Sequence, residues 1–203
     1  EKTVWQQVFD PNAQVWLIDG REAATLDDQG RFTVVSLADG QIVLAAQLDS
    51  QPELEGLFVQ RNSTHYIVAT KRPAAGDGRV FLGIQNTGQF PVTGQIYGVD
   101  RRTGRVMWSA PVQRQAVKIN QPPEVPVLAL LNQVQTMENN QYRVYMAMQC
   151  LDKRTGEELY SSNSREHHSN VYEMICDPEA GSVELQTMLG HVKITYSDQP
   201  SDK

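Results

Sequence analysis

One local pattern recurs four times along this sequence and limits the folds that the chain can adopt. Each copy consists of a strand-like run, a tight turn that ends in glycine, and a second strand-like run. The four glycines are Gly40, Gly104, Gly156 and Gly181. A single hairpin cannot bury its own apolar face, so four of them predict an array of sheets that cover one another.

Two further positions of the pattern are filled consistently when the four copies are aligned on glycine. A side chain that can accept backbone N–H bonds and initiate a turn stands four residues before the glycine. These residues are Ser36, Asp100, Asp152 and Asp177. A large side chain stands four residues after the glycine, at Leu44, Trp108, Tyr160 and Leu185. The glycine supplies the positive φ that ends the turn, and the returning strand buries the large side chain.

Period-two runs rich in valine, isoleucine and aromatic residues extend over the whole chain and predict strands. Examples are residues 14–18, 31–37, 41–45 and 64–69. No stretch sustains the apolar spacing of a helix over the length that a stable helix requires. The best helical candidate, residues 128–136, follows three prolines and agrees equally well with a strand. The expected fold class is all-β.

Two copies of the pattern share a longer motif, Asp-x-x-Thr-Gly-x-x-x followed by an aromatic residue. Its positions are Asp100, Thr103, Gly104 and Trp108 in one copy, and Asp152, Thr155, Gly156 and Tyr160 in the other. The motif resembles the PQQ-type β-propeller repeat of quinoprotein-like and outer-membrane assembly lipoprotein-like proteins. The match covers about residues 94–112 and 143–163, and it is weaker at Val34 to Leu44 and at Met174 to Leu185. The resemblance implies that Trp108 and Tyr160 dock between adjacent blades.

The spacing of the repeats bounds the number of blades. Successive glycines, Gly40 to Gly104 to Gly156 to Gly181, are 64, 52 and 25 residues apart. Propellers have 4–8 blades of four strands. We therefore expect antiparallel propeller-type blades that form an incomplete or open propeller fragment of about three to four blades. The provisional blades are residues 1–50, 51–112, 113–163 and 164–198 of one domain, followed by a polar tail, 199–203. Because the first residue is Glu, we expect a processed chain, a single domain or a piece of a longer one.

Composition and charge exclude several classes of partner. The 203 residues carry a formal net charge of −6, whereas nucleic-acid binders need clustered Lys and Arg, so we expect no nucleic-acid partner. The apolar runs are far shorter than the roughly 20 residues that span a bilayer, so we expect no transmembrane segment. Cys150 and Cys176 can form a disulfide or remain two thiols, and both alternatives stay open.

The resemblance raises the question of a quinone cofactor. In quinoprotein dehydrogenases the family pattern includes a vicinal disulfide, a tryptophan floor, a catalytic Asp, and Glu or Asn ligands to calcium. Cys150 and Cys176 are not adjacent, and turn formation already accounts for the repeat aspartates. His167 and His168, with Glu166, lack a second ligand cluster, and adjacent residues of an extended chain point to opposite sides. We expect no catalytic residue, no cofactor and no metal.

Two loops, residues 72–79 and 83–94, stand out as long glycine-containing insertions, and residues 113–126 are expected to form an extended linker. Loops on a rigid scaffold are suited to contact a partner. The first hypothesis is a non-catalytic, extracytoplasmic scaffold, periplasmic or extracellular and bacterial by resemblance, that binds another protein or the remaining blades of a larger chain. The alternative is the structural portion of a quinoprotein oxidoreductase or carbohydrate-processing enzyme whose active site lies outside this chain.

Overall fold

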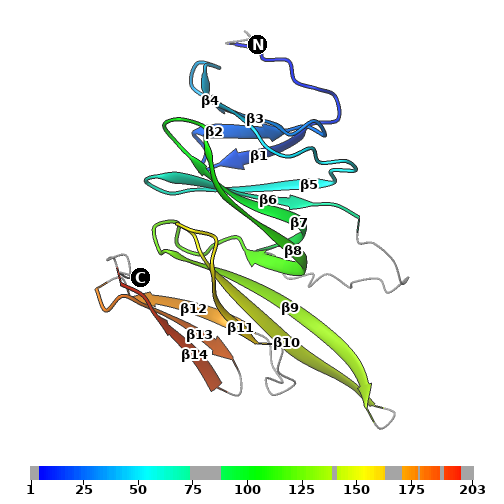
Figure 1. The fold of residues 1–203 in the computed structure, drawn as a ribbon, viewed down its shortest axis with the longest axis vertical. Helices are drawn as coiled ribbons and strands as arrows, with labels where there is room; N and C mark the ends of the chain where they lie inside the picture. The colour runs from blue at the N-terminus through cyan, green and yellow to red at the C-terminus, as the bar shows by residue number, and fades with distance from the viewer. Residues whose placement is uncertain are drawn as a thin grey trace. The chain divides into compact units, whose positions relative to one another are not determined.

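The computed structural model describes residues 5–73, 88–138, 141–162, 171–177, 179–187 and 190–197. Every regular element in these ranges is a β-strand, and every strand pair whose register is defined is antiparallel (Figure 1). The prediction of an all-β antiparallel fold is therefore confirmed.

The chain divides into two compact units, each with its own core. The first comprises residues 1–83, 90–115 and 154–156, and the second comprises residues 84–89, 116–153 and 157–203. The strand β8 (Val106–Lys118) runs from the first unit into the second. The provisional boundary at residue 50 falls between β4 and β5, which end and begin at Gln47 and Gly56.

The first unit opens with a four-stranded sheet in the order β1-β2-β3-β4. Its strands are β1 (Gln14–Ile18), β2 (Glu22–Leu26), β3 (Arg31–Ser36) and β4 (Ile42–Gln47). Because side chains alternate across a strand, Trp16 and Ile18 point to one face of β1, and Val15 and Leu17 to the other. The face with Trp16 and Ile18 packs in the core of the unit, together with residues of the next sheet.

The second sheet contains seven strands in the order β11-β10-β9-β8-β7-β6-β5. Besides β8, its strands are β5 (Gly56–Arg61), β6 (His65–Lys71), β7 (Gln89–Asp100), β9 (Val127–Glu138), β10 (Gln141–Asp152) and β11 (Glu158–Ser162). The ambiguous segment 128–136 lies within β9 and is a strand. Two expectations for irregular segments were wrong in part, because Gln113 to Lys118 continues β8 and Gln89 to Gly94 begins β7. In both strands, alternating apolar side chains continue into the segment that was expected to be irregular.

The second unit ends in a three-stranded sheet in the order β12-β13-β14. Its strands are β12 (Val171–Asp177), β13 (Ser182–Thr187) and β14 (Gly190–Thr195). One face of this sheet packs in the core of the second unit through Met174, Cys176, Leu185 and Ile194. The core also includes buried residues of β9 and β10, such as Ala129 and Cys150.

The four repeated turns lie in four hairpins: β3–β4, β7–β8, β10–β11 and β12–β13. Their glycines all have positive φ, with values of 72, 71, 75 and 56° at Gly40, Gly104, Gly156 and Gly181. A residue with a Cβ is strained in this region, so the turns favour glycine.

Candidate functional site

A buried ionic cluster lies at one end of the first unit, where β2 begins and β5 ends. The Glu22 carboxylate accepts hydrogen bonds from Arg61 Nη1 at 2.7 Å and from the Tyr66 hydroxyl at 2.9 Å. Arg61 also forms an ion pair with Asp19. Glu22 is nearly buried, and a buried carboxylate requires such partners. Both of its oxygens are engaged, which suits a structural or recognition role better than proton transfer.

Two further contacts enclose Tyr66. The Arg101 guanidinium carbon lies 5.6 Å from the centroid of the Tyr66 ring, a cation–π geometry, and Arg101 Nη1 donates to the Asn62 carbonyl at 2.8 Å. Burial, followed by the hydrogen bond to Glu22, raises the pKa of Tyr66 to about 12. The hydroxyl therefore remains a hydrogen-bond donor to Glu22 at neutral pH.

A pocket of about 440 Å³ opens beside this cluster. It is lined by Gly20, Arg21, Glu22, Ser36, Leu37, Ala38 and Arg61. Arg21 is exposed at its mouth, whereas Arg61 is held by the two carboxylates. Guanidinium groups and turn backbone are donors suited to carboxylate or peptide carbonyl groups. The pocket can recognise a polar or acidic segment.

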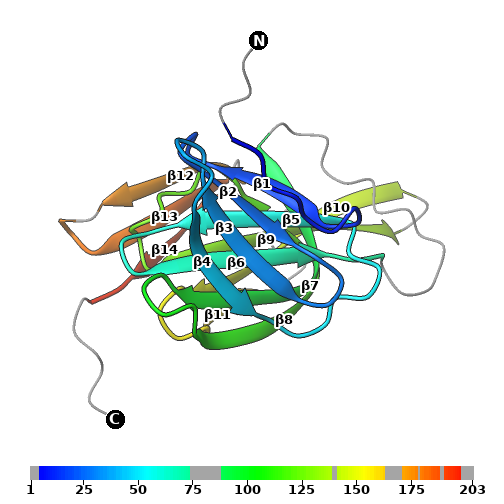
Figure 2. The ribbon, with the colours of Figure 1, turned by 90° about the horizontal axis from the view of Figure 1, so that it is seen from above.

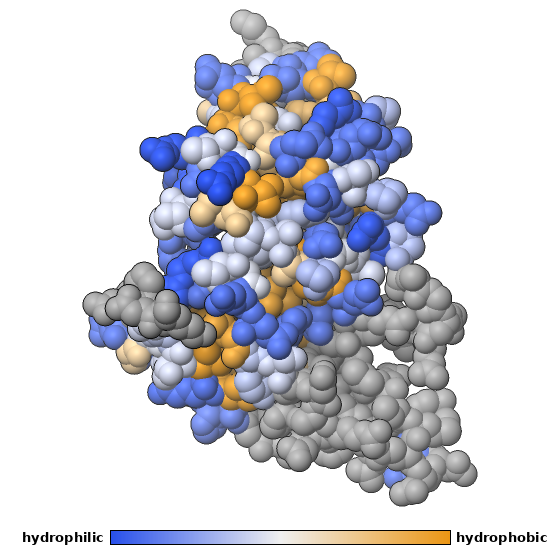
Figure 3. All heavy atoms as spheres, in the orientation of Figure 1, coloured by the Kyte–Doolittle hydropathy of each residue, from blue (hydrophilic) through white to orange (hydrophobic). Residues whose placement is uncertain are grey.

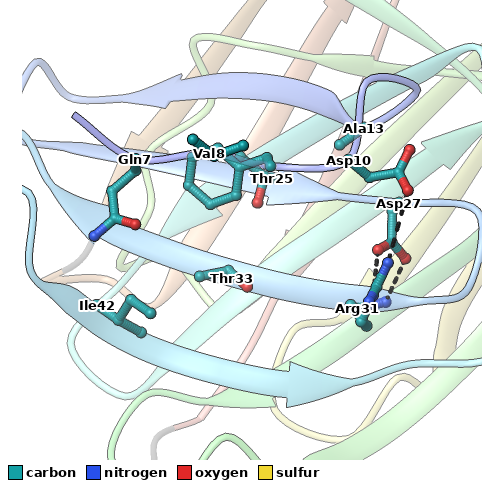
Figure 4. Close-up of a pocket in the computed structure, with 10 residues that line it drawn as sticks. Gln7, Val8, Asp10, Ala13, Thr25, Asp27, Arg31, Thr33 and Ile42 are labelled. Atoms are coloured by element: carbon teal, nitrogen blue, oxygen red, sulfur yellow. Dashed lines mark hydrogen bonds and ion pairs between the residues drawn. The ribbon is translucent and has the colours of Figure 1, made fainter.

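A second pocket of about 290 Å³ lies between the N-terminal segment and the first sheet. Figure 4 shows Arg31 of β3 directed at two carboxylates. Arg31 Nε pairs with Asp27 at 2.5 Å and Arg31 Nη2 with Asp10 at 3.7 Å. The hydrogen bond and charge of Asp27 raise the pKa of Arg31, so this group stays charged. The ion pairs fasten the N-terminal segment to the β2–β3 turn.

The Asp100 side chain closes the β7–β8 turn. Its Oδ1 accepts hydrogen bonds from Arg102 N at 3.1 Å, Thr103 N at 2.7 Å and Thr103 Oγ1 at 2.6 Å. The Gly104 amide donates to the Asp100 carbonyl at 2.9 Å. The hydrogen bonds from Thr103 lower the pKa of Asp100, because they favour the carboxylate. Turn formation thus accounts for this side chain without a ligand.

The residue four positions after the glycine packs on the glycine of the next hairpin in two cases within the first unit. A Cβ added to Gly156 would lie 2.6 Å from Trp108 Cε3. One added to Gly104 would lie 2.6 Å from the carbonyl oxygen of Ala45 and 3.5 Å, an ordinary van der Waals distance, from Leu44 Cδ1. Trp108 also lies against Gly98 and is 8% exposed. The Trp108 ring therefore fits only because Gly98 and Gly156 have no side chain.

The remaining repeat residues lie in the other two hairpins. Asp152 is nearly buried, and its amide donates to the Glu157 carbonyl at 2.8 Å, while Thr155 is exposed in the same turn. Asp177 Oδ1 accepts from the Ala180 amide at 2.9 Å in the turn that ends at Gly181. Tyr160 is half-buried and packs against the core of the second unit. Each of these positions has a local structural contact.

Lys153, directly after the repeat Asp152, is fully buried in the second unit. Its Nζ donates to the carbonyls of Pro122 at 2.8 Å and Pro123 at 3.3 Å. Burial lowers the pKa of Lys153 to about 7, and the neighbouring Cys176 and Glu124 side chains oppose this shift. The side chain ties the turn to the proline segment before β9.

Cys150 and Cys176 are free thiols, so the structure favours the second of the two alternatives. Burial raises the pKa of Cys150 to about 12 and also raises that of Cys176. Two non-adjacent thiols do not fit the vicinal disulfide of a quinone site. No group of three or more His, Cys, Asp or Glu side chains that could hold a metal occurs among the described residues.

Several sequence-based candidates lie outside the described residues. These are Glu166, His167 and His168, most of the loop 72–79 and the first part of the loop 83–94. In the part of the chain that the structure describes, no helix has the length and apolar character to cross a membrane.

Sequence reasoning missed the cluster of Glu22, Arg61 and Tyr66 and the buried Lys153. A glutamate at the head of the apolar run 22–26 was a signal for a buried charge, since such a charge requires a partner. The partner, Arg61, lies 39 residues away, and nothing in the spacing identifies it. For Lys153, the equivalent repeat position holds Arg101, and the repeat pattern does not distinguish the surroundings of the two side chains.

No family model matches this chain, and no curated protein matches it. Among solved structures, the computationally designed protein Ika4 is similar at 10% identity and a TM-score of 0.48, over 97% of this chain and 99% of that one. BamB from Moraxella catarrhalis is similar at 11% identity and a TM-score of 0.32, over 87% of this chain and 74% of that one. The designed protein Ika8 is similar at 12% identity and a TM-score of 0.25, over 91% and 71%.

Proposed function

We propose that this chain is a non-catalytic, propeller-type scaffold of an extracytoplasmic compartment that binds another protein. The observation that carries the proposal is the docking of Leu44 and Trp108 on successive hairpin glycines, which makes a rigid support from a repeated contact. The PQQ-type motif and the fully engaged carboxylate of Glu22 agree with a binding role. Rigid sheets with polar turns at their ends present those turns for recognition.

The pocket beside Glu22 is the proposed contact for an extended, acidic segment of the partner. Arg21 is exposed, and it lines the pocket together with Ser36, Leu37 and Ala38. A guanidinium can bind a carboxylate through two parallel hydrogen bonds. The partner's affinity is therefore expected to depend on the charge of Arg21.

The test uses the chain as bait against an extract of the source cells, together with two variants of equal charge change. A stoichiometric protein partner is expected to bind the wild type and Arg102→Glu, an exposed turn position of the same unit, and to be lost from Arg21→Glu. Loss with both variants would point to general charge and contradict the pocket assignment. Turnover of a substrate by the purified chain would end the proposal.

A cofactor titration separates the enzyme alternative. PQQ added with calcium is expected to leave the cofactor's absorbance spectrum unchanged, because the described residues hold neither a vicinal thiol pair nor a metal-ligand cluster. A saturable spectral change would favour a quinoprotein oxidoreductase instead.

A further inference from the structure

Trp5 contacts Gly40 in the same way as Trp108 contacts Gly156. A Cβ added to either glycine would meet the same three ring atoms, Cδ2, Cε3 and Cγ, at 2.7, 2.8 and 2.9 Å for Trp5 and at 2.7, 2.6 and 3.1 Å for Trp108. Trp5 Nε1 also donates to the Leu37 carbonyl at 3.0 Å. Trp5 therefore occupies the docking position of the repeat, although it precedes the first sheet.

In the two other contacts of this kind, the docking side chain comes from a strand that follows one repeat turn, and it packs on the glycine of the next repeat turn. Leu44 belongs to β4, the last strand of the first sheet, and docks on Gly104 of the next hairpin unit along the chain. Trp108 belongs to β8, which follows the Gly104 turn, and docks on Gly156. In each case the docking strand directly follows one repeat turn and contacts the next one. By this rule Trp5 belongs to the last strand of a sheet that comes before β1.

The face of the first sheet opposite its core is exposed at both of its edge strands. Val15 and Leu17 of β1 and Ile42 of β4 are 60, 66 and 58% exposed, and exposed apolar side chains that lie together mark interaction sites. Figure 2 looks onto this sheet, and Figure 3 shows hydrophobic residues at the surface of its edge near the top of the view.

The N-terminal segment, residues 5–10, fixes one path across this face. Gln7 Nε2 donates to the Gly40 carbonyl at 2.8 Å at the β3–β4 turn, and Asp10 pairs with Arg31 at the β2–β3 turn. Figure 4 shows the segment running beside Thr25, Thr33 and Ile42. An extended segment in this position has backbone groups available to pair with further strands.

The three-stranded sheet of the second unit does not match this face. Its face opposite the core carries mostly polar side chains, and they are Glu173, Ile175, Glu184, Gln186, His191, Lys193 and Thr195. Burying these charges against Val15 and Leu17 would leave them without water or partners. Neither this sheet nor its counterpart in a second copy is therefore a suitable cover, and such a polar face is typical of the capping end of a repeat array.

We infer that the outer face of β1–β4 carries a further four-stranded antiparallel sheet of the same repeat type, with residues 5–9 as its outermost strand. The sheet belongs to the same polypeptide, because the outer strand of each repeated hairpin follows its neighbour after a turn of a few residues. This inference rests on the scaffold part of the proposed function and is independent of the pocket beside Glu22.

Thiol labelling tests the inference on the natural gene product and on the 203-residue chain, both with Cys176→Ser. Leu17→Cys places a thiol on the apolar face, and Glu173→Cys places a matched exposed thiol on the polar face. The thiol at position 17 is expected to react roughly tenfold or more slowly in the gene product than in the 203-residue chain, because a packed sheet shields it. The thiol at position 173 should react equally fast in both proteins.

Three outcomes would overturn the inference. One is equal reactivity at position 17 in both proteins, and another is a gene product without enough residues before Glu1 to form three strands. The third is a dimer of the 203-residue chain in sedimentation experiments that shields position 17, which would identify a second copy as the cover. None of these depends on the Arg21→Glu binding test, so the two proposals can fail separately.

Discussion

The hairpins around Gly104 and Gly156 have nearly the same sequence, Asp-Arg-Arg-Thr-Gly and Asp-Lys-Arg-Thr-Gly, but their environments differ. After the first turn, Trp108 is buried against Gly98 and Gly156, whereas after the second Tyr160 is half-buried. The residue after the aspartate also differs, since Arg101 lies over the Tyr66 ring and Lys153 is enclosed by proline carbonyls. A shared motif therefore fixes the turn, and the neighbouring elements fix what its side chains do.

The largest expected difference is between the two aromatic residues. Trp108→Ala should destabilise the protein by roughly 3–5 kcal/mol, because it empties a site enclosed by two glycines. Tyr160→Ala should cost roughly 1–2 kcal/mol, since less of this ring is removed from water. Urea denaturation followed by circular dichroism measures both. Equal losses would show that the two docking positions are equivalent after all.

The next effect concerns the glycine under the Trp108 ring. Gly156→Ala should cost roughly 2–3 kcal/mol, because the new Cβ would collide with the ring and the backbone has positive φ. Gly20→Ala is the matched control, as Gly20 has a φ of 72° but nothing within 4 Å of the added atom. Its expected cost is about 1 kcal/mol from the backbone alone. If the two variants lose the same stability, the ring contact contributes nothing.

A third effect is the pH dependence of folding stability, which Lys153 should cause and Arg101, at the equivalent repeat position, should not. The pKa of Lys153 is lowered to about 7 in the folded state from 10.5, so between these values the unfolded chain binds a proton that the folded chain lacks. The contribution of this group to stability should therefore rise with pH, by roughly 1.5 kcal/mol between pH 7 and 8.5. The thiols of the unfolded chain, whose ordinary pKa is about 8.5, reduce the rise near the upper end of this range.

The control for this titration is a lysine of the same unit. Lys153→Met should abolish the rise between pH 7 and 8.5, whereas Lys193→Met, at an exposed strand position, should leave it unchanged. Unfolding midpoints at several pH values measure the slope, so a change in the overall stability of either variant does not affect the result. A slope that persists in Lys153→Met would contradict a neutral, buried lysine.

Much of the fold was predictable because local chemistry determines it. The alternation of β1 and β3 and the glycine turns are encoded within a few residues, and all four hairpins follow from them. The candidate site was not predictable, because Glu22 of the first sheet and Arg61 of the second meet only when the two sheets pack against each other. Their contact depends on how the two sheets pack, and no spacing in the sequence predicts that packing.

The burial of Lys153 shows the same limit at a single position. Its motif predicts a tight turn, and within that turn the Asp152 amide donates to the Glu157 carbonyl. The side chain is buried because residues 122 and 123 pass over the turn, a contact 30 residues distant in sequence. A local pattern describes the backbone of such a turn but not what covers it.

The smallest expected effect lies in the turn of the first motif itself. Asp100→Ala removes three hydrogen bonds at an exposed site, so its loss of stability should be smaller than that of Gly20→Ala. The pKa of Asp100 is lowered in the folded state, so its contribution is present above the unfolded pKa and disappears as pH falls through the folded value. The difference between wild type and Asp100→Ala should therefore be constant at neutral pH and shrink in acid. Asp100→Asn, which keeps an acceptor oxygen without the charge, should retain most of the stability and lose this pH dependence, and a difference that grows in acid would show that the carboxylate is not the group that closes the turn.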